Sequence, residues 1–185
     1  MLHLIVALIV ITVLTIVLVL LVVFAAFQTS RTRIGYIPLR AAAVSAVIKA
    51  LDMKSQKATL FDLGCGDGRI LEAAVQAHPN LRAVGIEFNP IVVWLARWRL
   101  RKYVDRIQIS RGDLLQTDLR QAAYIFTYLN FPTMALLEPK LKKELPPGAR
   151  LVSCDFPLPT RKPTRTVKIG GSWQLAQTLY VYDYA

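Results

Sequence analysis

Residues 61–70, FDLGCGDGRI, combine acidic side chains with a glycine-rich loop, a combination that is typical of nucleotide-like ligand sites. The three glycines occupy alternate positions, at Gly64, Gly66 and Gly68. Glycine permits a positive φ and a close backbone approach, so a ligand can lie against the main chain and the N-terminus of the next helix. Asp62 precedes the glycines and Asp67 lies among them. Two carboxylates would repel a pyrophosphate and attract a cation.

The loop does not fit the common phosphate-binding patterns. A dinucleotide-binding loop reads Gly-x-Gly-x-x-Gly, but Arg69 stands where the third glycine would be. The Gly-Lys-Ser/Thr ending of a P-loop is also missing from residues 61–70. S-adenosylmethionine carries an ammonium and a sulfonium, so it suits an acidic loop. The sequence therefore predicts this ligand, held by Asp62, Asp67 and the three glycines.

Three further features follow the next three expected strands in order. Glu87 ends the second strand, about twenty residues past the loop, where a carboxylate suits ribose hydroxyls. Asp113 follows the third strand and is placed to meet an adenine amino group. Asn130, within YLNFP at 128–132, follows the fourth strand, where the transferred group would lie. For each residue alone, a structural role in a turn or helix cap is as good an explanation as a role in ligand binding. Their occurrence at successive strand ends favours a ligand-binding site.

Alternating strands and helices must position these residues. We expect strands at 58–62, 82–87, 106–113, 122–129 and 149–156, and helices at 40–51, 69–77, 91–103 and 134–145. Pro139 is placed to kink the last helix, and the tail predicts an antiparallel pair on either side of Gly170-Gly171. In the 91–103 helix, Ile91, Trp94, Leu95 and Trp98 share one face. This order predicts an α/β fold with a parallel sheet, helices on both faces and a ligand beyond the carboxyl ends of the strands.

The motifs DLGCGDGRI, GIEFNP, RGDLL and YLNFP resemble those of class I S-adenosylmethionine-dependent methyltransferases. From about Tyr36 onward, the chain is similar to the small membrane-anchored lysine N-methyltransferases of the ATP synthase c-subunit and adenine nucleotide translocator type. The resemblance implies a Rossmann-like seven-stranded sheet, with Asp113 and Leu114 at the adenine and with Asn130 and Tyr128 facing the methyl acceptor. This chain departs from the family pattern in reading Asn-Phe-Pro-Thr from position 130.

Residues 4–27 contain no charged side chain and are long enough to cross a membrane as a helix. A cleaved signal peptide fits poorly, because only His3 and the amino terminus precede the apolar run. We therefore expect a transmembrane anchor at 1–30 and a methyltransferase domain at 31–185. Arg31, Arg33, Arg40 and Lys49 follow the span, which predicts a cytoplasmic domain with the N-terminus on the opposite side.

The net charge of +11 falls entirely after residue 30 and favours anionic partners. An anionic lipid surface and a protein substrate at the membrane are the expected partners. Nucleic acid remains an alternative, because basic residues concentrate at 97–106 and 140–168. A lipid methyltransferase and a non-catalytic scaffold of the same fold also remain open. The two cysteines show no metal-ligand spacing, so no metal is expected.

For methyl transfer to lysine, the amine must be neutral and desolvated. Tyr36, Tyr128, Phe131 and Phe156 are candidates to line an aromatic slot that would favour this form, although ordinary core packing explains any one of them equally well.

Overall fold

A computed structural model describes residues 2–32, 38–54, 58–169 and 178–185, with the backbone alone for residues 2 and 25–32. The chain divides into two compact units, residues 1–35 and 36–185. The first unit consists of helix α1 (Leu2–Thr32). Its segment His3–Phe24 has a mean hydropathy of 3.5, and its length and composition suffice to cross a membrane. This helix suggests a membrane anchor.

The two threonine hydroxyls inside this apolar segment are satisfied within the helix. The Thr12 and Thr15 hydroxyls donate hydrogen bonds to the carbonyls of Leu8 and Ile11, each at 2.8 Å. This back-bonding removes the cost of placing a free hydroxyl donor in a lipid environment. Residues 4–24 of α1 are therefore compatible with a hydrocarbon surrounding.

The second unit is built on a seven-stranded sheet of order β3-β2-β1-β4-β5-β7-β6. Strands β1 to β5 are parallel, whereas β7 runs antiparallel to both β5 and β6. The strands are β1 (Thr59–Leu63), β2 (Arg82–Glu87), β3 (Ile107–Arg111), β4 (Tyr124–Thr127), β5 (Arg150–Cys154), β6 (Arg165–Lys168) and β7 (Thr178–Asp183). The order reverses between β1 and β4, which is where ligands bind in sheets of this kind. This topology confirms the predicted seven-stranded class I methyltransferase sheet.

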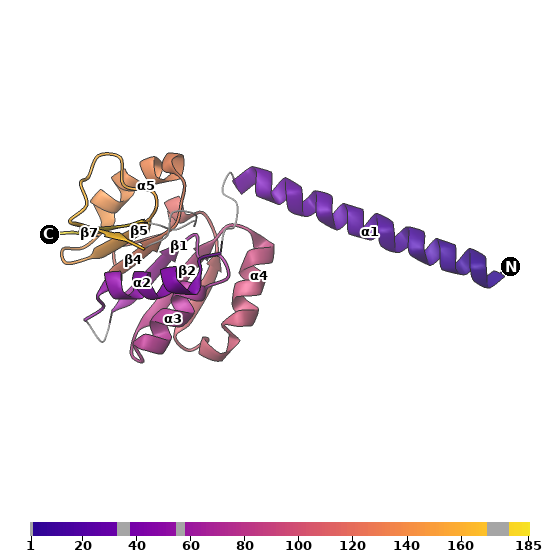
Figure 1. Cartoon of the computed structure of the whole chain (residues 1–185), viewed down its shortest axis with the longest axis horizontal. Helices are drawn as coiled ribbons and strands as arrows, with labels where there is room; N and C mark the ends of the chain where they lie inside the picture. The colour runs from indigo at the N-terminus through magenta and orange to yellow at the C-terminus, as the bar shows by residue number, and fades with distance from the viewer. Residues whose placement is uncertain (1, 33–37, 55–57, 170–177) are drawn as a thin grey trace. The chain divides into compact units, whose positions relative to one another are not determined.

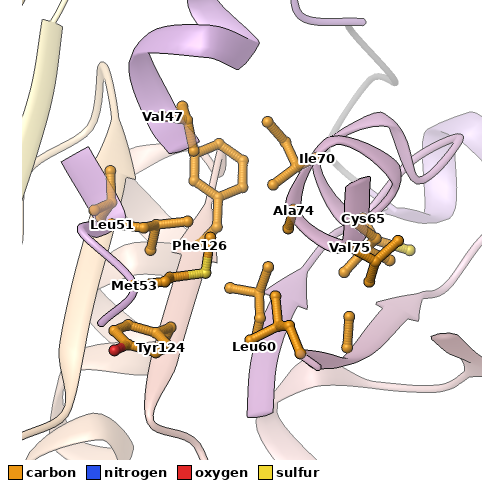
Figure 2. Packing of buried hydrophobic residues seen from close by; sticks show 14 of the residues in the cluster. Val47, Leu51, Met53, Leu60, Cys65, Ile70, Ala74, Val75, Tyr124 and Phe126 are labelled. Carbon is orange, nitrogen blue, oxygen red and sulfur yellow. The ribbon is translucent and has the colours of Figure 1, made fainter. Parts of the chain in front are cut away.

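Helices cover both faces of the sheet (Figure 1). One face carries α2 (Ala41–Leu51), α3 (Arg69–Ala77) and α4 (Pro90–Arg99), and the other carries α5 (Phe131–Glu144). Between α2, α3 and the sheet lies a continuous apolar cluster (Figure 2), to which Val47, Leu51, Leu60, Ile70 and Phe126 contribute. Their burial fixes the helical layer that presents the loop after β1.

Several boundaries follow from local capping. Helix α3 and strand β2 begin and end where the sequence predicts. Helix α4 ends at Arg99 and is followed by a short 3₁₀ helix, η1 (Arg101–Tyr103), so the expected 91–103 helix is two elements. Helix α5 begins three residues earlier than predicted, because Asn130 caps it, and it continues through Pro139. The tail strands β6 and β7 pair as predicted, while their connection at 170–177 lies outside the described residues.

Candidate functional site

The glycine loop joins β1 to α3 at the carboxyl edge of the sheet. Gly64 and Gly68 adopt φ values of 83° and 78°, a conformation that side chains other than glycine rarely take. An added Cβ at Gly68 would lie 2.4 Å from Leu100 Cδ1, so this position is also closed by packing. The N–H groups of Gly64 and Cys65 both donate to the Ile86 carbonyl, at 2.9 and 3.0 Å. The loop is therefore held in one shape against the end of β2.

Asp62 lies in β1 directly before the loop and is 2% exposed. Among the residues that the structure describes, its Oδ1 atom has no hydrogen-bond partner. Burial raises the pKa of this carboxyl well above its usual range, and the nearby Glu87 and Asp67 charges raise it further. A buried polar atom without a partner is costly and calls for an explanation. A ligand ammonium is the natural partner for it.

Asp67 is engaged elsewhere. Its carboxylate accepts hydrogen bonds from Arg69 Nε and Nη2 at 3.0 and 2.9 Å, and from Arg99 Nη1 at 2.9 Å. Two arginines therefore compensate the charge that the sequence argument assigned to the ligand. These bonds tie the loop to α4, and Arg69 also donates to the Leu39 carbonyl. Direct cofactor contact by Asp67 stays a prediction that this pairing does not support.

Glu87 stands at the last position of β2, as predicted, and its two oxygens point to the loop and to the next helix. Oε2 accepts from Gly66 N–H at 3.2 Å, and Oε1 accepts from Asn89 N–H at 2.9 Å. Asn89 in turn caps α4 through its side-chain oxygen. The carboxylate is thus held beside the glycine loop at the edge where a ribose would lie.

Asp113 does not lie in a strand, because β3 ends at Arg111. Its side chain caps a short 3₁₀ helix, η2 (Leu114–Gln116), by accepting from Leu115 N–H at 2.9 Å. Gly112 N–H donates to the Glu87 carbonyl at 3.1 Å, so the β3 end is tied to the β2 end. This bond brings the segment of Asp113 and Leu114 to the same edge as Glu87. Their contact with an adenine stays a prediction.

Asn130 and Tyr128 follow β4 at the fourth strand end. Asn130 Oδ1 accepts from Thr133 N–H and Oγ1 at 3.1 and 2.7 Å, so its carbonyl oxygen caps α5. Tyr128 is part of an aromatic cluster: its ring centroid lies 6.2 Å from that of Phe156, which Phe131 contacts edge-on at 5.1 Å. The structure thus brings together three of the four expected slot residues, and Tyr36 lies outside the described residues. Catalytic roles for Asn130 and Tyr128 stay predictions.

Asp155 is a candidate that the sequence argument missed. It follows β5 with a φ of 59°, and it forms a side-chain hydrogen bond with Tyr128. Burial raises the Tyr128 pKa to about 12, and the Asp155 carboxylate contributes to the same shift. Asp155 Oδ1 also accepts from Thr178 N–H at 3.1 Å. The sequence places Asp155 inside the expected 149–156 strand, and only the end of β5 at Cys154 puts it at a strand end.

These residues fit S-adenosylmethionine. Asp62 Oδ1, which has no partner among the described residues, offers an acceptor for the ligand ammonium, and Gly64 and Gly66 contribute bare backbone at positive φ. Glu87 supplies the acid at the next strand end. In the described part of the chain, no group of three or more His, Cys, Asp or Glu side chains could hold a metal ion. Both cysteines are buried free thiols.

Comparison with known protein families gives a match over residues 62–165 to the ANTKMT methyltransferase domain. A protein-lysine N-methyltransferase of Saccharolobus islandicus is 30% identical over 151 residues, which are 80% of this chain and 92% of that protein. The adenine nucleotide translocase lysine N-methyltransferase of Mus musculus is 40% identical over 76% of this chain. The ATP synthase c-subunit lysine N-methyltransferase of Rattus norvegicus is 34% identical over 80% of it. The matched segments are 61% and 65% of these last two proteins.

Among solved structures, an RNA methyltransferase from Salinibacter ruber in complex with S-adenosyl-L-homocysteine superposes with a TM-score of 0.72. It is 32% identical, and the match covers 79% of this chain and 92% of that one. A mitomycin 7-O-methyltransferase superposes with a TM-score of 0.61 at 19% identity, which supports the fold alone.

Proposed function

This chain belongs to the family of ANTKMT methyltransferase domains and is a protein-lysine N-methyltransferase that uses S-adenosylmethionine. On that premise, we propose that the lysine it methylates belongs to a membrane protein. The mouse and rat relatives take their names from the adenine nucleotide translocase and from the ATP synthase c-subunit. The long apolar helix at the N-terminus supports an acceptor at the membrane. The observation that carries the proposed site is the buried Asp62 Oδ1 beside the glycine loop, which has no hydrogen-bond partner within the described parts of the chain.

When bound, S-adenosylmethionine supplies an electrophilic methyl group on a positively charged sulfur. The residues of the chain have to orient the cofactor and present a neutral amine in line with that methyl group. Asp62 would hold the ammonium and Glu87 the ribose hydroxyls. The loop backbone at Gly64 and Gly66 would lie along the ligand between these two acids.

The aromatic cluster of Tyr128, Phe131 and Phe156 would receive the lysine side chain. Desolvation by these rings lowers the pKa of an entering amine, which favours the neutral nucleophile. The Tyr128 pKa of about 12 keeps its phenol protonated near neutral pH, so Tyr128 acts as a hydrogen-bonding group and not as a base. Asp155 places a carboxylate beside the phenol and would attract the lysine while it is still an ammonium.

The test is to incubate native membranes with a methyl-labelled donor and the full chain, and to separate protein, lipid and RNA before measuring the label. The Asp62→Asn variant is the matched control, because it removes the charge of the proposed cofactor contact and keeps the shape of the side chain. Label in a membrane protein that depends on Asp62 supports the proposal. Label in the lipid or RNA fraction, or equal labelling by both chains, would overturn it.

We further infer that the methyltransferase domain faces the cytoplasm. Arginine and lysine are in excess after the span, and neither occurs before it. Protease added to sealed, right-side-out vesicles should leave the domain intact, and digestion would reverse the assignment.

An RNA substrate is the competing possibility, because the Salinibacter structure is described as an RNA methyltransferase. The cations at 97–106 give it little support, since most already have partners. Arg97 donates to the Ile109 carbonyl, Arg99 pairs with Asp67 and Glu72, and Arg106 donates to the Val75 and Pro79 carbonyls. Strong, salt-sensitive RNA binding by the full chain would favour this alternative.

A further inference from the structure

Helix α4 is apolar on two opposite sides, and the described protein covers only one of them. Val92, Val93 and Ala96 are buried against the sheet, where α4 packs on β2 and β3. On the other side, Ile91, Trp94, Leu95 and Trp98 recur with helical spacing and are 48%, 67%, 37% and 57% exposed. We call these four residues the outer face of α4. A surface helix of a soluble domain is normally polar on this side.

Two further exposed apolar residues flank α4 in the sequence. Phe88, just before the helix, is 47% exposed, and Val104, just after η1, is also exposed. Scattered single apolar residues are normal on a protein surface, but large contiguous patches mark interaction sites. Two of the three tryptophans of the chain lie in this one patch. Figure 1 shows α4 on the same side of the sheet as α2 and α3, where it packs on the edge strand β3 and on β2.

The charges around the outer face are basic. Pro90–Arg99 contains no acidic residue, and its Arg97 and Arg99 are held by the Ile109 carbonyl and by Asp67 and Glu72. The basic rim of the outer face is therefore formed by Arg101 and by Lys102, whose side chain is 61% exposed. The Arg101 guanidinium lies 4.9 Å from the centre of the Trp98 ring and donates to the Trp98 carbonyl. Tryptophan and arginine beside an apolar stripe are typical of helices that lie in a membrane interface. A basic rim is complementary to anionic headgroups.

We propose that the outer face of α4 docks into the headgroup region of an anionic phospholipid bilayer. The same chain carries an apolar helix long enough to span one. Residues 33–40 lie between α1 and α2, and a segment of that length reaches at most about 29 Å. A bilayer is therefore the surface that the tethered domain meets at the highest effective concentration. A second copy is a poorer occupant, because a symmetric contact would bring the two basic rims together.

Docking at α4 would place the site at the membrane. Helix α4 begins at Pro90, and Glu87 ends the strand just before it, so this helix starts at the edge that carries the proposed cofactor site. With α4 in the interface, that edge lies at headgroup level, where lysines flanking a membrane span are found. This consequence rests on the proposed function, whereas the docking itself does not.

The test uses the full chain reconstituted in vesicles of phosphatidylcholine and phosphatidylglycerol. A Trp173→Phe background leaves Trp94 and Trp98 as the tryptophan reporters. Lipids with brominated acyl chains quench tryptophans in the bilayer, and acrylamide quenches tryptophans in water. For an interfacial helix, which lies about 5–10 Å into the boundary, we expect brominated lipid to reduce the emission about twofold or more and acrylamide to have little effect.

The other outcomes overturn the proposal. Quenching by acrylamide without quenching by lipid would show that the outer face is in water. Protection from both quenchers would show that protein covers it, either a second copy or a partner. Replacing phosphatidylglycerol by phosphatidylcholine should weaken the lipid quenching, and unchanged quenching would remove the role of the basic rim.

A matched pair of variants isolates the outer face. Ile91→Glu with Leu95→Glu should abolish lipid quenching and expose the tryptophans to acrylamide. Leu136→Glu makes the same change at a 64% exposed position on α5, on the opposite face of the sheet, and should have no effect. Binding of S-adenosylhomocysteine by calorimetry reports folding of each variant. Because quenching needs neither cofactor nor acceptor, loss of docking and loss of methyltransferase activity are separate results.

Discussion

Replacing Asp62 by asparagine should make the ligand-free protein more stable and its cofactor binding weaker. The Oδ1 atom of Asp62 is buried without a partner in the described residues, and its pKa is raised by burial and by Glu87 and Asp67. An unsatisfied buried polar group costs about 1–3 kcal/mol, and a charged one costs more. Asparagine keeps the shape and removes the charge, so the free energy of unfolding should rise by about 1–3 kcal/mol near pH 7.

The change in stability has a defined pH dependence. A folded-state pKa above the unfolded value of 3.8 means that the native state disfavours the ionised carboxylate. The wild-type protein therefore has its full stability from this group below that pH and loses it as the pH rises through the folded-state pKa. Asparagine does not titrate, so the advantage of the variant should be small in acid and should widen toward neutral pH.

Cofactor binding should change in the opposite direction. A hydrogen bond to a charged group contributes about 1.5–3 kcal/mol, so the dissociation constant should rise about 10- to 100-fold. Calorimetry with S-adenosylhomocysteine measures this loss. Thermal unfolding of the detergent-solubilised chain measures the gain, at about 2–4 °C per kcal/mol for a domain of this size.

A purely structural role for Asp62 predicts a different pattern. If the side chain only supported the fold, the asparagine variant would lose stability and would bind the cofactor as tightly as before. A lower melting temperature without ligand, or an unchanged dissociation constant, would refute the assignment of Asp62 to the ligand ammonium.

Three further changes test other parts of the site. Gly68→Ala should lower the free energy of unfolding by about 2–4 kcal/mol, because φ at this position is 78° and the new Cβ would meet Leu100. Gly112→Ala is the control and should leave the stability unchanged, because a Cβ there meets nothing within 4 Å. Equal melting temperatures of the two variants would contradict this reasoning. Glu87→Ala should weaken cofactor binding about 100-fold or more, since the variant loses a charged acceptor, and unchanged binding by calorimetry would exclude Glu87 from the site. Tyr128→Phe should reduce kcat up to about 10-fold with the cofactor Kd unchanged, and an equal loss in both would place Tyr128 at the cofactor.

The positions of the candidate cofactor residues in the fold follow well from the sequence, because Asp62 and Glu87 lie in or at the end of predictable strands. These strands are short and apolar, and the parallel sheet then brings the two residues to one edge. The reversal of strand order between β1 and β4 follows from the family resemblance. The pattern of strands along the sequence does not give their order in the sheet.

The remaining details depend on partners that are distant in the sequence. Asp67 resembles a ligand-binding acid until Arg99, thirty-two residues later, is found beside it. Asp155 becomes a candidate only because β4 and β5 are neighbours, which brings it to Tyr128. Both are side-chain contacts between elements, and periodicity within one element carries no information about them.

For helix α4, the sequence predicts which residues share a face but not which face is buried. The spacing of Ile91, Trp94, Leu95 and Trp98 correctly predicts a shared face. Only the structure shows that this face is exposed and that the smaller Val92, Val93 and Ala96 occupy the core side. A helix with two apolar faces gives no signal for which of them the sheet covers.

The central claim is methyl transfer to a lysine by the site at Asp62 and Glu87. Its most direct test is amino-acid analysis of membrane protein after incubation with a methyl-labelled donor and the full chain. We expect labelled methyllysine with the wild-type chain and a large reduction with Glu87→Ala. Label in another residue, or the same methyllysine yield from the variant, would contradict the claim.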